Sequence, residues 1–462
     1  MMPRTVAFHT LGCKVNFYDT EAVWRLFADA NYEQVDFSQR ADVYVINTCT
    51  VTNEGDRKSR QMIRRAVRNN PDAVVVVMGC YAQMAPDEIL EIDGVDLVVG
   101  NQDRKRLLEL VDRVQAERTP FHTVTPILPQ KEFEDFDVPL FADRTRASLK
   151  IEDGCNHFCT FCIIPYARGL VRSRRPDSVL RQARRLADAG YREIVLTGIH
   201  TGGYGEDLEN YTLADLLREL EAVEGLRRIR ISSIEASEIT DDLVCVLARS
   251  RKVCRHLHIP LQAGHKEVLR RMNRHYTIEQ FAGKLASVRE ALPELAVTSD
   301  VIVGFPGETD EYYRATEEFV QSQAFAQLHV FPYSRRTGTP ADRFTDHVPE
   351  DVKRERVLRL LRVSERLSAD YAARWRWRTL EVIPEEIRRV GETDLLVGHA
   401  DNYLLVAFAA DARLIGEVCE VRVEQTGGEL SIGVLQSVLS DREDAADRAR
   451  VGILLGEGGR NE

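Results

Sequence analysis

Apolar runs alternate with stretches of helical period from Thr5 to about Gly100. The apolar runs are VAFHTLG, DVYVINTC, AVVVVMGC and DLVVGN, and helical stretches lie between them, one of them strongly basic. Strands that are connected through helices form parallel sheets, and unbroken apolar runs are typical of strands buried on both faces. The pattern therefore predicts an N-terminal parallel-sheet domain over residues 3–116.

The same alternation returns after residue 147. Six candidate strands are ASLKIEDG, EIVLTGIH, RIRISSIE, HLHIPLQ, TSDVIVGFP and LHVFPYS, separated by helical stretches such as DSVLRQARRLADAG. Repeated strand-helix units with right-handed crossovers give either an open doubly wound sheet or a barrel. Six units favour a partial (β/α)6 barrel over residues 147–349, and the fold class is α/β.

Three other segments show different patterns. Residues 117–146 mix prolines with acidic residues and lack a clear period, which indicates a linker. Residues 350–378 have the pattern of a long amphipathic helix, and residues 379–440 contain short strands broken by Gly, Asn and Asp, which predicts a small β-barrel. The charged, glycine-rich residues 441–462 are expected to be disordered.

Length and composition limit the class of protein. A chain of 462 residues suggests about three domains, and 44% hydrophobic with 29% charged residues is typical of soluble globular proteins. The first residues lack the layout of a secretory signal, and the apolar runs are far shorter than the roughly 20 residues that span a bilayer. We therefore expect a cytoplasmic protein without a membrane partner. The net charge of −11 restricts any RNA contact to a local basic patch.

Three of the nine cysteines form the motif CNHFCTFC directly after the first strand of the six-unit domain. Cys155, Cys159 and Cys162 would surround one small volume, and thiolates are the usual ligands of iron-sulfur clusters. Three ligands on a four-iron cluster leave one iron open. Zinc is the alternative, but a structural zinc site needs a fourth ligand in register, whereas His157 lies inside the motif.

Three further cysteines, Cys13, Cys49 and Cys80, each follow a different apolar run of the N-terminal domain. Ligands bind open parallel sheets outside the carboxyl ends of the strands, so these thiols are expected to converge in one crevice. The alternative is three buried core thiols, because cysteine often behaves as a small apolar residue. Their position after three separate strands favours a second metal cluster. The remaining cysteines, Cys245, Cys254 and Cys419, lack ligand spacing and are expected to be structural.

These motifs resemble the radical S-adenosylmethionine (SAM) methylthiotransferase family along nearly the whole chain. TLGCKVN, NTCTV and MGCYAQ are similar to its N-terminal domain, and the terminal barrel with GHADNYLLV resembles a TRAM domain. Similar to its catalytic domain are CNHFCTFCIIPYARGLVRSR, HIPLQAGHKEVLRRMNRHYT, DVIVGFPGET and FPYSRRTGTPA. The resemblance implies a transferase that uses two [4Fe-4S] clusters and SAM.

In that family, SAM on the open iron of the Cys155, Cys159 and Cys162 cluster yields a 5′-deoxyadenosyl radical, and the methylthio sulfur comes from the Cys13, Cys49 and Cys80 cluster. The resemblance also implies SAM contacts from Gly198, Glu235 and Gln262. The sequence IEAS at Glu235 departs from the family pattern, which commonly has proline after the glutamate. An electron donor such as a flavodoxin or ferredoxin and a source of sulfur are implied as partners.

The motifs GCKVN and CIIPYARG resemble the group of this family that acts on threonylcarbamoyladenosine. The predicted substrate is thus N(6)-threonylcarbamoyladenosine at position 37 in the anticodon stem-loop of tRNA, methylthiolated at carbon 2. Isopentenyladenosine in tRNA and an aspartate of a ribosomal protein are the alternatives. Several acidic residues of the terminal barrel keep the protein target open: Glu381, Glu385, Glu386, Asp401, Asp411, Glu417 and Glu420. An RNA-binding scaffold with one structural metal site is the alternative of another class.

Two basic groups are candidates for contacts with tRNA phosphates. Arg168, Arg172, Arg174 and Arg175 follow the CNHFCTFC motif. Arg57, Lys58, Arg60, Arg64 and Arg65 follow Cys49 on a predicted helix, where a solvated charged face is an equally good interpretation. His256 and His258 alternate on a predicted strand, and without a carboxylate such a pair is more often structural or substrate-facing than a metal site.

Overall fold

The computed structural model describes residues 4–136, 145–427 and 429–439. The N-terminal domain is a parallel six-stranded sheet in the order β2-β1-β3-β4-β5-β6. Its strands are β1 (Thr5–Thr10), β2 (Glu33–Gln34), β3 (Val43–Thr48), β4 (Val74–Gly79), β5 (Leu97–Val99) and β6 (Phe121–His122). The short edge strand β6 lies in the segment predicted to be a linker, so that segment begins as part of this sheet.

Helices cover both faces of this sheet. They are α1 (Lys14–Asp29), α2 (Asn53–Asn69), α3 (Cys80–Met84), α4 (Pro86–Leu90), the 3-10 turn η1 (Arg104–Arg106) and α5 (Leu107–Glu117). Phe27 of α1 and Leu110 of α5 pack on the face that carries Val45, whereas Ile63 of α2 packs on the face that carries Ile46. Neighbouring residues of β3 thus point to opposite helical layers, which explains why the whole strand is apolar.

Six parallel strands form the second domain, here called the catalytic barrel, and confirm the predicted partial barrel. They are β7 (Arg146–Lys150), β10 (Glu193–Thr197), β11 (Arg228–Ile231), β12 (His256–His258), β13 (Ala296–Val303) and β14 (Gln327–Pro332). The order is β7-β10-β11 and β12-β13-β14, and an Ile229–Val253 bridge links the two halves. Helices outside the strands are α7 (Pro176–Asp188), α8 (Leu213–Glu221), α9 (Asp241–Arg249), α10 (Lys266–Arg271), α11 (Ile278–Ala291) and α12 (Asp310–Ser322).

A long helix leads to the third domain. Helix α13 (Glu350–Ala373) runs beside β14 and ends five residues before the predicted boundary at 378. The third domain, the terminal barrel, is a closed barrel in the order β15-β16-β17-β19-β18. Its strands are β15 (Thr379–Val390), β16 (Thr393–Ala400), β17 (Leu405–Phe408), β18 (Val418–Gln425) and β19 (Ser431–Leu439). The predicted disordered tail 441–462 and linker residues 137–144 lie outside the described residues.

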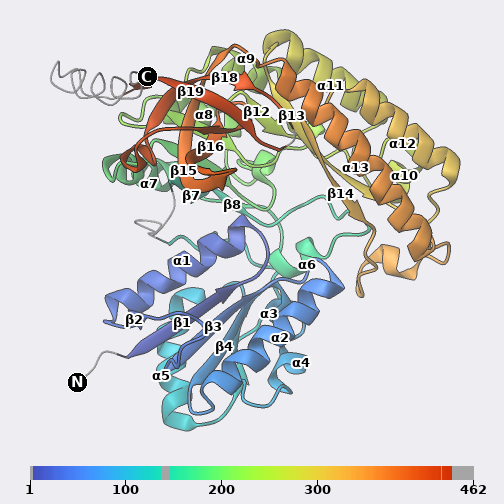
Figure 1. Ribbon diagram of the computed structural model, residues 1–462. Coiled ribbons are helices and arrows are strands. Elements are labelled where there is room, and N and C mark those ends of the chain that lie inside the picture. The colour runs from blue at the N-terminus through green and yellow to red at the C-terminus, as the bar shows by residue number, and fades with distance from the viewer. Residues whose placement is uncertain (1–3, 137–144, 428, 440–462) are drawn as a thin grey trace.

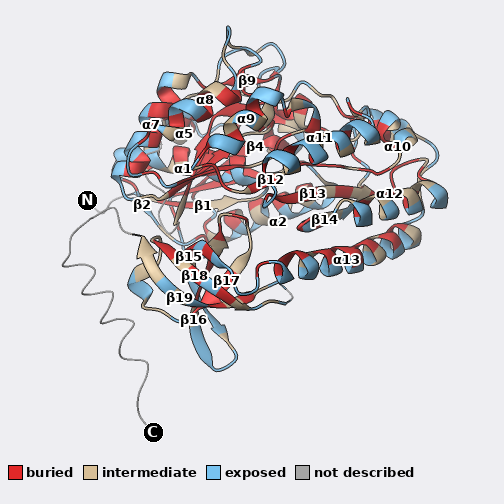
Figure 2. Ribbon diagram, turned by 90° about the horizontal axis from the view of Figure 1, so that it is seen from above, coloured by how far each residue is buried: buried red, intermediate tan, exposed pale blue. Residues whose placement is uncertain are grey.

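The terminal barrel sits at the amino ends of the catalytic-barrel strands. Arg146 pairs with Glu385 at 2.7 Å, Arg228 donates to the carbonyl of His399 at 3.3 Å, and Arg230 donates to that of Asp401 at 3.1 Å. Figure 2 shows buried strands at the centre of the molecule, exposed outward faces on the helices and an exposed end of the β15–β16 hairpin. No helix within the described part of the chain is long and apolar enough to cross a membrane.

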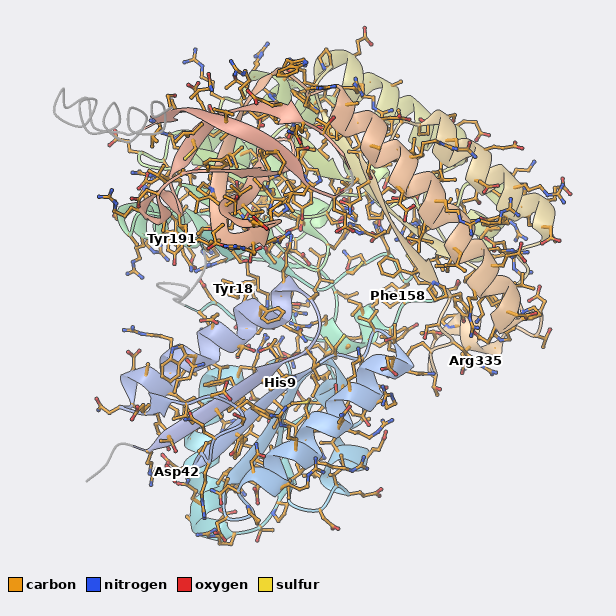
Figure 3. All side chains as sticks on the ribbon, viewed as in Figure 1. His9, Tyr18, Asp42, Phe158, Tyr191 and Arg335 are labelled. Carbon is orange, nitrogen blue, oxygen red and sulfur yellow. The ribbon has the colours of Figure 1, made fainter. Side chains whose placement is uncertain are left out.

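Helix α1 joins the N-terminal domain to the catalytic barrel. In Figure 3, Tyr18 and Phe158 lie where the two domains meet. The Tyr18 hydroxyl donates to Oε1 of Gln182 on α7 at 3.3 Å, and Asp19 on the next position pairs with Lys150 of β7 at 2.8 Å. Because these contacts are buried, the two domains meet through a packed interface.

Candidate functional site

The N-terminal cysteine trio, Cys13, Cys49 and Cys80, lies at the carboxyl ends of three neighbouring strands. Cys49 directly follows β3, and Cys80 directly follows Gly79 at the end of β4. Gly79 has φ +96°, and a Cβ there would come within 2.5 Å of the Thr48 carbonyl oxygen, so glycine is required where β4 turns into α3. The pKa of the Cys49 thiol is raised to about 11, mainly by burial and in part by the nearby Cys80 and Cys13. The predicted convergence of the three thiols is therefore present.

The barrel cysteine trio, Cys155, Cys159 and Cys162, lies on the loop after β7. Two short antiparallel strands, β8 (Glu152–Asp153) and β9 (Arg172–Ser173), lie at the two ends of the loop. The Cys155 amide donates to the Gly169 carbonyl at 3.0 Å. Burial raises the pKa of Cys162 to about 12, with a further contribution from Cys159. Cys80 of the N-terminal trio also raises it, and Arg168 of α6 (Ile164–Arg168), the helix that follows Cys162, donates to Sγ of Cys80 at 3.2 Å, so the two trios lie near one another.

The spacing of the thiols bears on which metal group they fit. Among the described residues, two groups of three metal-binding side chains have their ligand atoms within 4.8 Å of one another, and neither contains a cysteine. Two thiolates bound to one zinc ion lie within about 4.6 Å of one another, because each zinc-sulfur bond is about 2.3 Å long. The sulfur atoms of each trio do not all lie that close together, so one zinc ion fits neither trio. Buried thiols with raised pKa values need a positive group to become thiolates, which fits a larger iron-sulfur cluster.

Each cysteine trio receives a hydrogen bond from a buried arginine, and the arginine is a different one in each case. Arg168 of α6 (Ile164–Arg168) donates through Nε to Sγ of Cys80 at 3.2 Å, and Arg274 donates to Sγ of Cys159 at 3.4 Å. Arg274 also pairs with Glu235. Sequence reasoning assigned Arg168 to RNA and did not single out Arg274, because a hydrogen bond to a distant thiol leaves no local pattern.

The predicted RNA contacts of Arg168, Arg172 and Arg174 are wrong. These side chains belong to residues only 0, 2 and 1% exposed, so phosphates cannot reach them. Arg168 pairs with Asp19 at 2.7 Å and with Asp153 at 3.2 Å, and Arg174 pairs with Asp135 at 2.7 Å. A run of arginines after a cysteine motif predicts a basic surface. Here the anionic partners lie on other elements, so the sequence around the arginines does not show them.

The other predicted basic residues are accessible. The side chain of Arg175 is 84% exposed. On α2, Arg64 and Arg65 are exposed, while Arg57 pairs with Glu54 and Arg60 pairs with Glu88 at 3.2 Å. These arginines of α2 lie on the helix that follows Cys49, whereas Arg175 directly precedes α7.

The residues predicted to contact SAM lie on loops that follow three catalytic-barrel strands. Gly198 directly follows β10 and packs against Glu152. A side chain at position 198 would collide with the Glu152 carboxylate. Burial raises the pKa of Glu152 to about 8, and its Oε2 accepts from the amide of His200 at 2.7 Å. Glu235 follows β11, and Gln262, with φ +64°, follows β12.

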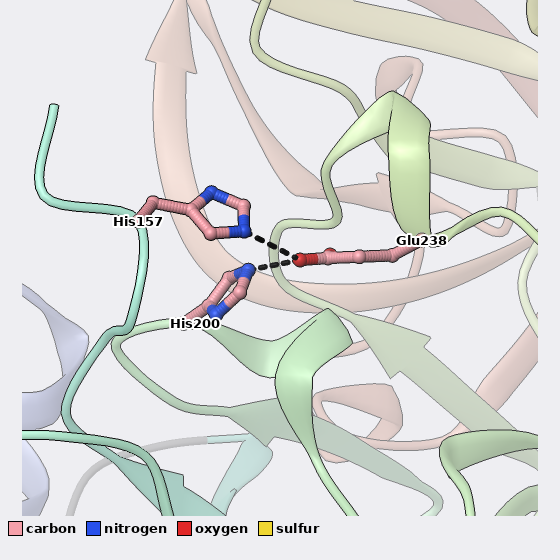
Figure 4. A group of neighbouring side chains, drawn as sticks. All are labelled: His157, His200 and Glu238. Atoms are coloured by element: carbon pink, nitrogen blue, oxygen red, sulfur yellow. Dashed lines mark ion pairs between the residues drawn. The ribbon is translucent and has the colours of Figure 1, made fainter. Parts of the chain in front are cut away.

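A group that the sequence did not indicate lies beside Cys155 (Figure 4). His157 and His200 both approach the Glu238 carboxylate, His157 at 3.7 Å, and their ring centroids are 4.3 Å apart. Burial lowers the pKa of His157 to about 3. The His200–Glu238 pair joins the loop after β10 to the loop after β11, and His157 brings the cysteine loop to the same carboxylate.

Comparison with known proteins agrees with this geometry. The model of the Radical SAM superfamily matches residues 149–320, and the model described as Uncharacterized protein family UPF0004 matches residues 5–100. The chain is 57% identical over 95% of its length, and 97% of the relative, to threonylcarbamoyladenosine tRNA methylthiotransferase MtaB of Bacillus subtilis (strain 168). The chain belongs to the MtaB-like radical SAM methylthiotransferase family. It is therefore an enzyme of tRNA modification that uses SAM and an iron-sulfur cluster.

Two further comparisons place the methylthiotransferase in its superfamily. It is 34% identical over 90% of its length, and 87% of the relative, to the tRNA-2-methylthio-N(6)-dimethylallyladenosine synthase of Acetivibrio thermocellus. The radical SAM methyltransferase TsrM from Kitasatospora setae, solved with cobalamin and a [4Fe-4S] cluster, has a TM-score of 0.56 at 18% identity, over 74% of this chain and 77% of that one. The second likeness shows a shared fold alone.

Proposed function

We propose that this methylthiotransferase converts N(6)-threonylcarbamoyladenosine at tRNA position 37 to its 2-methylthio derivative. The barrel trio holds a [4Fe-4S] cluster that binds SAM, and the N-terminal trio holds a second cluster. The observation that carries the proposal is the hydrogen bond of 3.2 Å from Arg168, on the helix that follows the barrel trio, to Sγ of Cys80, because it brings cysteines of the two domains close together. Two clusters that serve one base must share one cavity, because radical transfer requires close positioning.

The bound groups supply the radical and the sulfur, and the chain supplies their positions. Arg168 and Arg274 each donate a hydrogen bond to one thiolate, which orients Cys80 and Cys159 and offsets their charge. Glu152 holds the loop of Gly198 through the His200 amide, and Glu235 is fixed by Arg274. The buried surroundings of Cys80 and Cys159 exclude water from the reacting atoms.

Support for tRNA as the substrate comes from exposed cations. The side chain of Arg175 is 84% exposed, and Arg64 and Arg65 of α2 are exposed, so phosphates can reach all three. The terminal barrel acts as a TRAM-like module that contacts the RNA. An electron donor such as a flavodoxin or ferredoxin and a sulfur source complete the reaction, which takes place in the cytoplasm.

The acidic residues of the terminal barrel do not favour a basic protein target. Glu385 pairs with Arg146 at 2.7 Å, Glu381 approaches Arg228 at 3.8 Å, and Glu417 approaches Arg192 at 3.7 Å. These carboxylates attach the terminal barrel to the catalytic barrel, so their charge is already balanced within the chain.

The test is an anaerobic reaction of the iron-reconstituted protein with SAM, a reductant and anticodon stem-loops that carry different bases at position 37. We expect a methylthio product from threonylcarbamoyladenosine and none from isopentenyladenosine or unmodified adenosine, measured by nucleoside mass spectrometry. Product from isopentenyladenosine alone would transfer the assignment to that substrate. A protein that forms neither product nor 5′-deoxyadenosine would be a scaffold.

A further inference from the structure

The inner face of the catalytic barrel carries a polar group below the cysteines. Residues alternate between the two faces of a strand, and Leu257, Val297 and Leu328 belong to the core outside the barrel. Their neighbours therefore face the interior. We call these the lumen group: His258 of β12, Thr298 and Asp300 of β13, and His329 of β14.

The lumen group is held together by the strand register and by direct contacts. Asp300 is paired in register with His329, and Thr298 with His258. His258 approaches Asp300 at 3.3 Å through Nε2 and shares a hydrogen bond of 2.9 Å with the Thr298 hydroxyl through Nδ1. The ligand atoms of His258, Asp300 and His329 all lie within 4.8 Å of one another. The sequence showed His258 alone, and the carboxylate and second imidazole come from strands 40 and more residues away.

Lys14 of α1 brings a positive charge to the same interior. Burial is the main reason that the pKa of His329 lies below its usual value, and the charge of Lys14 lowers it further. The same two causes act on His256, where Arg230 also contributes. Lys14 directly follows Cys13 and is the first residue of α1.

A cavity opens beside Lys14. Its volume is about 430 Å³. It is lined by Lys14 of the N-terminal domain, by Arg146 and Ser148 of the catalytic barrel, and by His399 and Tyr403 of the terminal barrel. His256 stacks on Tyr403 with ring centroids 4.3 Å apart, which connects the cavity to the polar face of β12. Both cationic and anionic side chains, such as Arg146 and Glu385, line this cavity, and it adjoins the strand that carries His258.

An exposed aromatic residue lies beyond the lumen group, toward the cysteines. Phe331 is two residues beyond His329 on β14, on the same face, and is 49% exposed. Two residues along a strand span about 6.6 Å, toward the end where the cysteines lie. A base stacked at Phe331 would have its carbon 2 near the cysteines, while a substituent on N6 would extend toward His329.

We propose that the lumen group and Lys14 bind the threonylcarbamoyl substituent of the target base. This inference rests on the proposed function and names the residues that select the substrate. The substituent carries a carboxylate, a hydroxyl and ureido N–H groups. Lys14 binds the carboxylate, Asp300 accepts from the hydroxyl or an N–H group, and the imidazole of His329 completes the hydrogen bonds.

Two other occupants fit the same residues less well. A divalent metal ion on His258, Asp300 and His329 would experience repulsion from Lys14, whose charge already acts on His329. An isopentenyl group has no donor or acceptor to offer Asp300 and His329 once the base excludes water, which costs binding energy. A ligand with an anion and several donors offers the anion to Lys14 and the donors to Asp300.

The experiment compares binding of two synthetic anticodon stem-loops to the protein with both clusters rebuilt. One carries threonylcarbamoyladenosine at position 37 and the other unmodified adenosine. The wild type is expected to prefer the modified loop, and Lys14→Met and Asp300→Asn are expected to reduce that preference about ten-fold or more, the usual effect of losing a hydrogen bond to a charged group. Lys284→Met on the exposed face of α11 is the matched control and keeps the preference.

Iron content and 5′-deoxyadenosine formation without RNA show that each variant keeps its clusters. Asp300→Asn is remote from the cysteines in sequence, so it remains informative if Lys14→Met loses iron. An unchanged preference in Asp300→Asn would overturn the inference, as would one bound zinc ion per wild-type chain that this variant lacks. If the wild type forms product but binds both loops equally, the inference alone fails. If it forms no product from the modified loop, the proposed function fails.

Discussion

Arg168 donates through Nε to Sγ of Cys80 at 3.2 Å, although 88 residues separate the two in the chain. Arg168 belongs to the catalytic barrel and Cys80 to the N-terminal domain. The same guanidinium pairs with Asp19 of α1 and with Asp153 beside the barrel trio. One buried side chain therefore links both cysteine trios to the domain interface, and the relative position of the trios depends on it.

Replacing Arg168 with methionine is expected to destabilise the protein by about 3–5 kcal/mol, because Asp19 and Asp153 would lose part of their compensation while remaining buried. The pKa of both carboxyls is held below its usual range, against the effect of burial, by neighbouring cations that include Arg168. Thermal unfolding and iron content measure the effect. Arg175→Met, which removes an exposed arginine seven residues later, should change stability by no more than about 0.5 kcal/mol. Equal losses in both variants would contradict the interpretation.

Single cysteine replacements should separate the two trios. Cys159→Ala is expected to abolish 5′-deoxyadenosine formation, because three thiolates are needed to hold the cluster that binds SAM. Cys49→Ala should retain SAM cleavage and about four of the eight irons but form no methylthio product. Chromatography of the nucleosides and iron analysis distinguish these results. Methylthiolation by Cys49→Ala would reduce the N-terminal trio to core thiols.

Salt dependence should identify which cations contact phosphates. The double change Arg64→Gln and Arg65→Gln on α2 is expected to reduce the slope of log Kd against log salt by at most about two. Fluorescence anisotropy with a labelled stem-loop measures the slope. Arg106→Gln with Arg113→Gln makes the same charge change at the opposite face of the N-terminal sheet, where both arginines pair with glutamates. A similar slope change in that control would show a general charge effect.

Acid should weaken the junction between the catalytic and terminal barrels through Glu193. Burial alone would raise the pKa of Glu193, but Arg230, Arg228 and Arg146 hold it at about 2. A lowered pKa means that the ionised carboxylate stabilises the folded state above pH 4.5, and that this contribution of about 3 kcal/mol is lost as the pH falls from 4.5 through 2.

Glu193→Gln is therefore expected to be less stable than the wild type at pH 6, where it leaves Arg230 buried without its main partner, and to lose less stability between pH 5.5 and 3.5. Melting curves followed by circular dichroism at the two pH values measure the difference. Parallel losses in both proteins would assign acid sensitivity to other carboxyls.

Local pattern was sufficient for the elements and for the two cysteine trios. Each strand is an apolar run whose period is readable in a few residues, and the carboxyl ends of parallel strands meet at one edge. A cysteine that directly follows such a run, such as Cys49 or Cys80, is therefore placed near the others by topology alone. The six strands of the catalytic barrel and the closed terminal barrel follow from the same periodicity.

The environment of charged side chains was decided only by the tertiary structure. Arg168 and Arg175 belong to the same arginine-rich stretch after the CNHFCTFC motif, yet one is buried and the other exposed, because Asp19 and Cys80 reach Arg168 from another domain. The lumen group likewise needs the register of β12, β13 and β14, which brings His258, Asp300 and His329 together. Burial and pairing are sums over contacts from distant segments, whereas a sequence pattern records only the period of its own strand or helix.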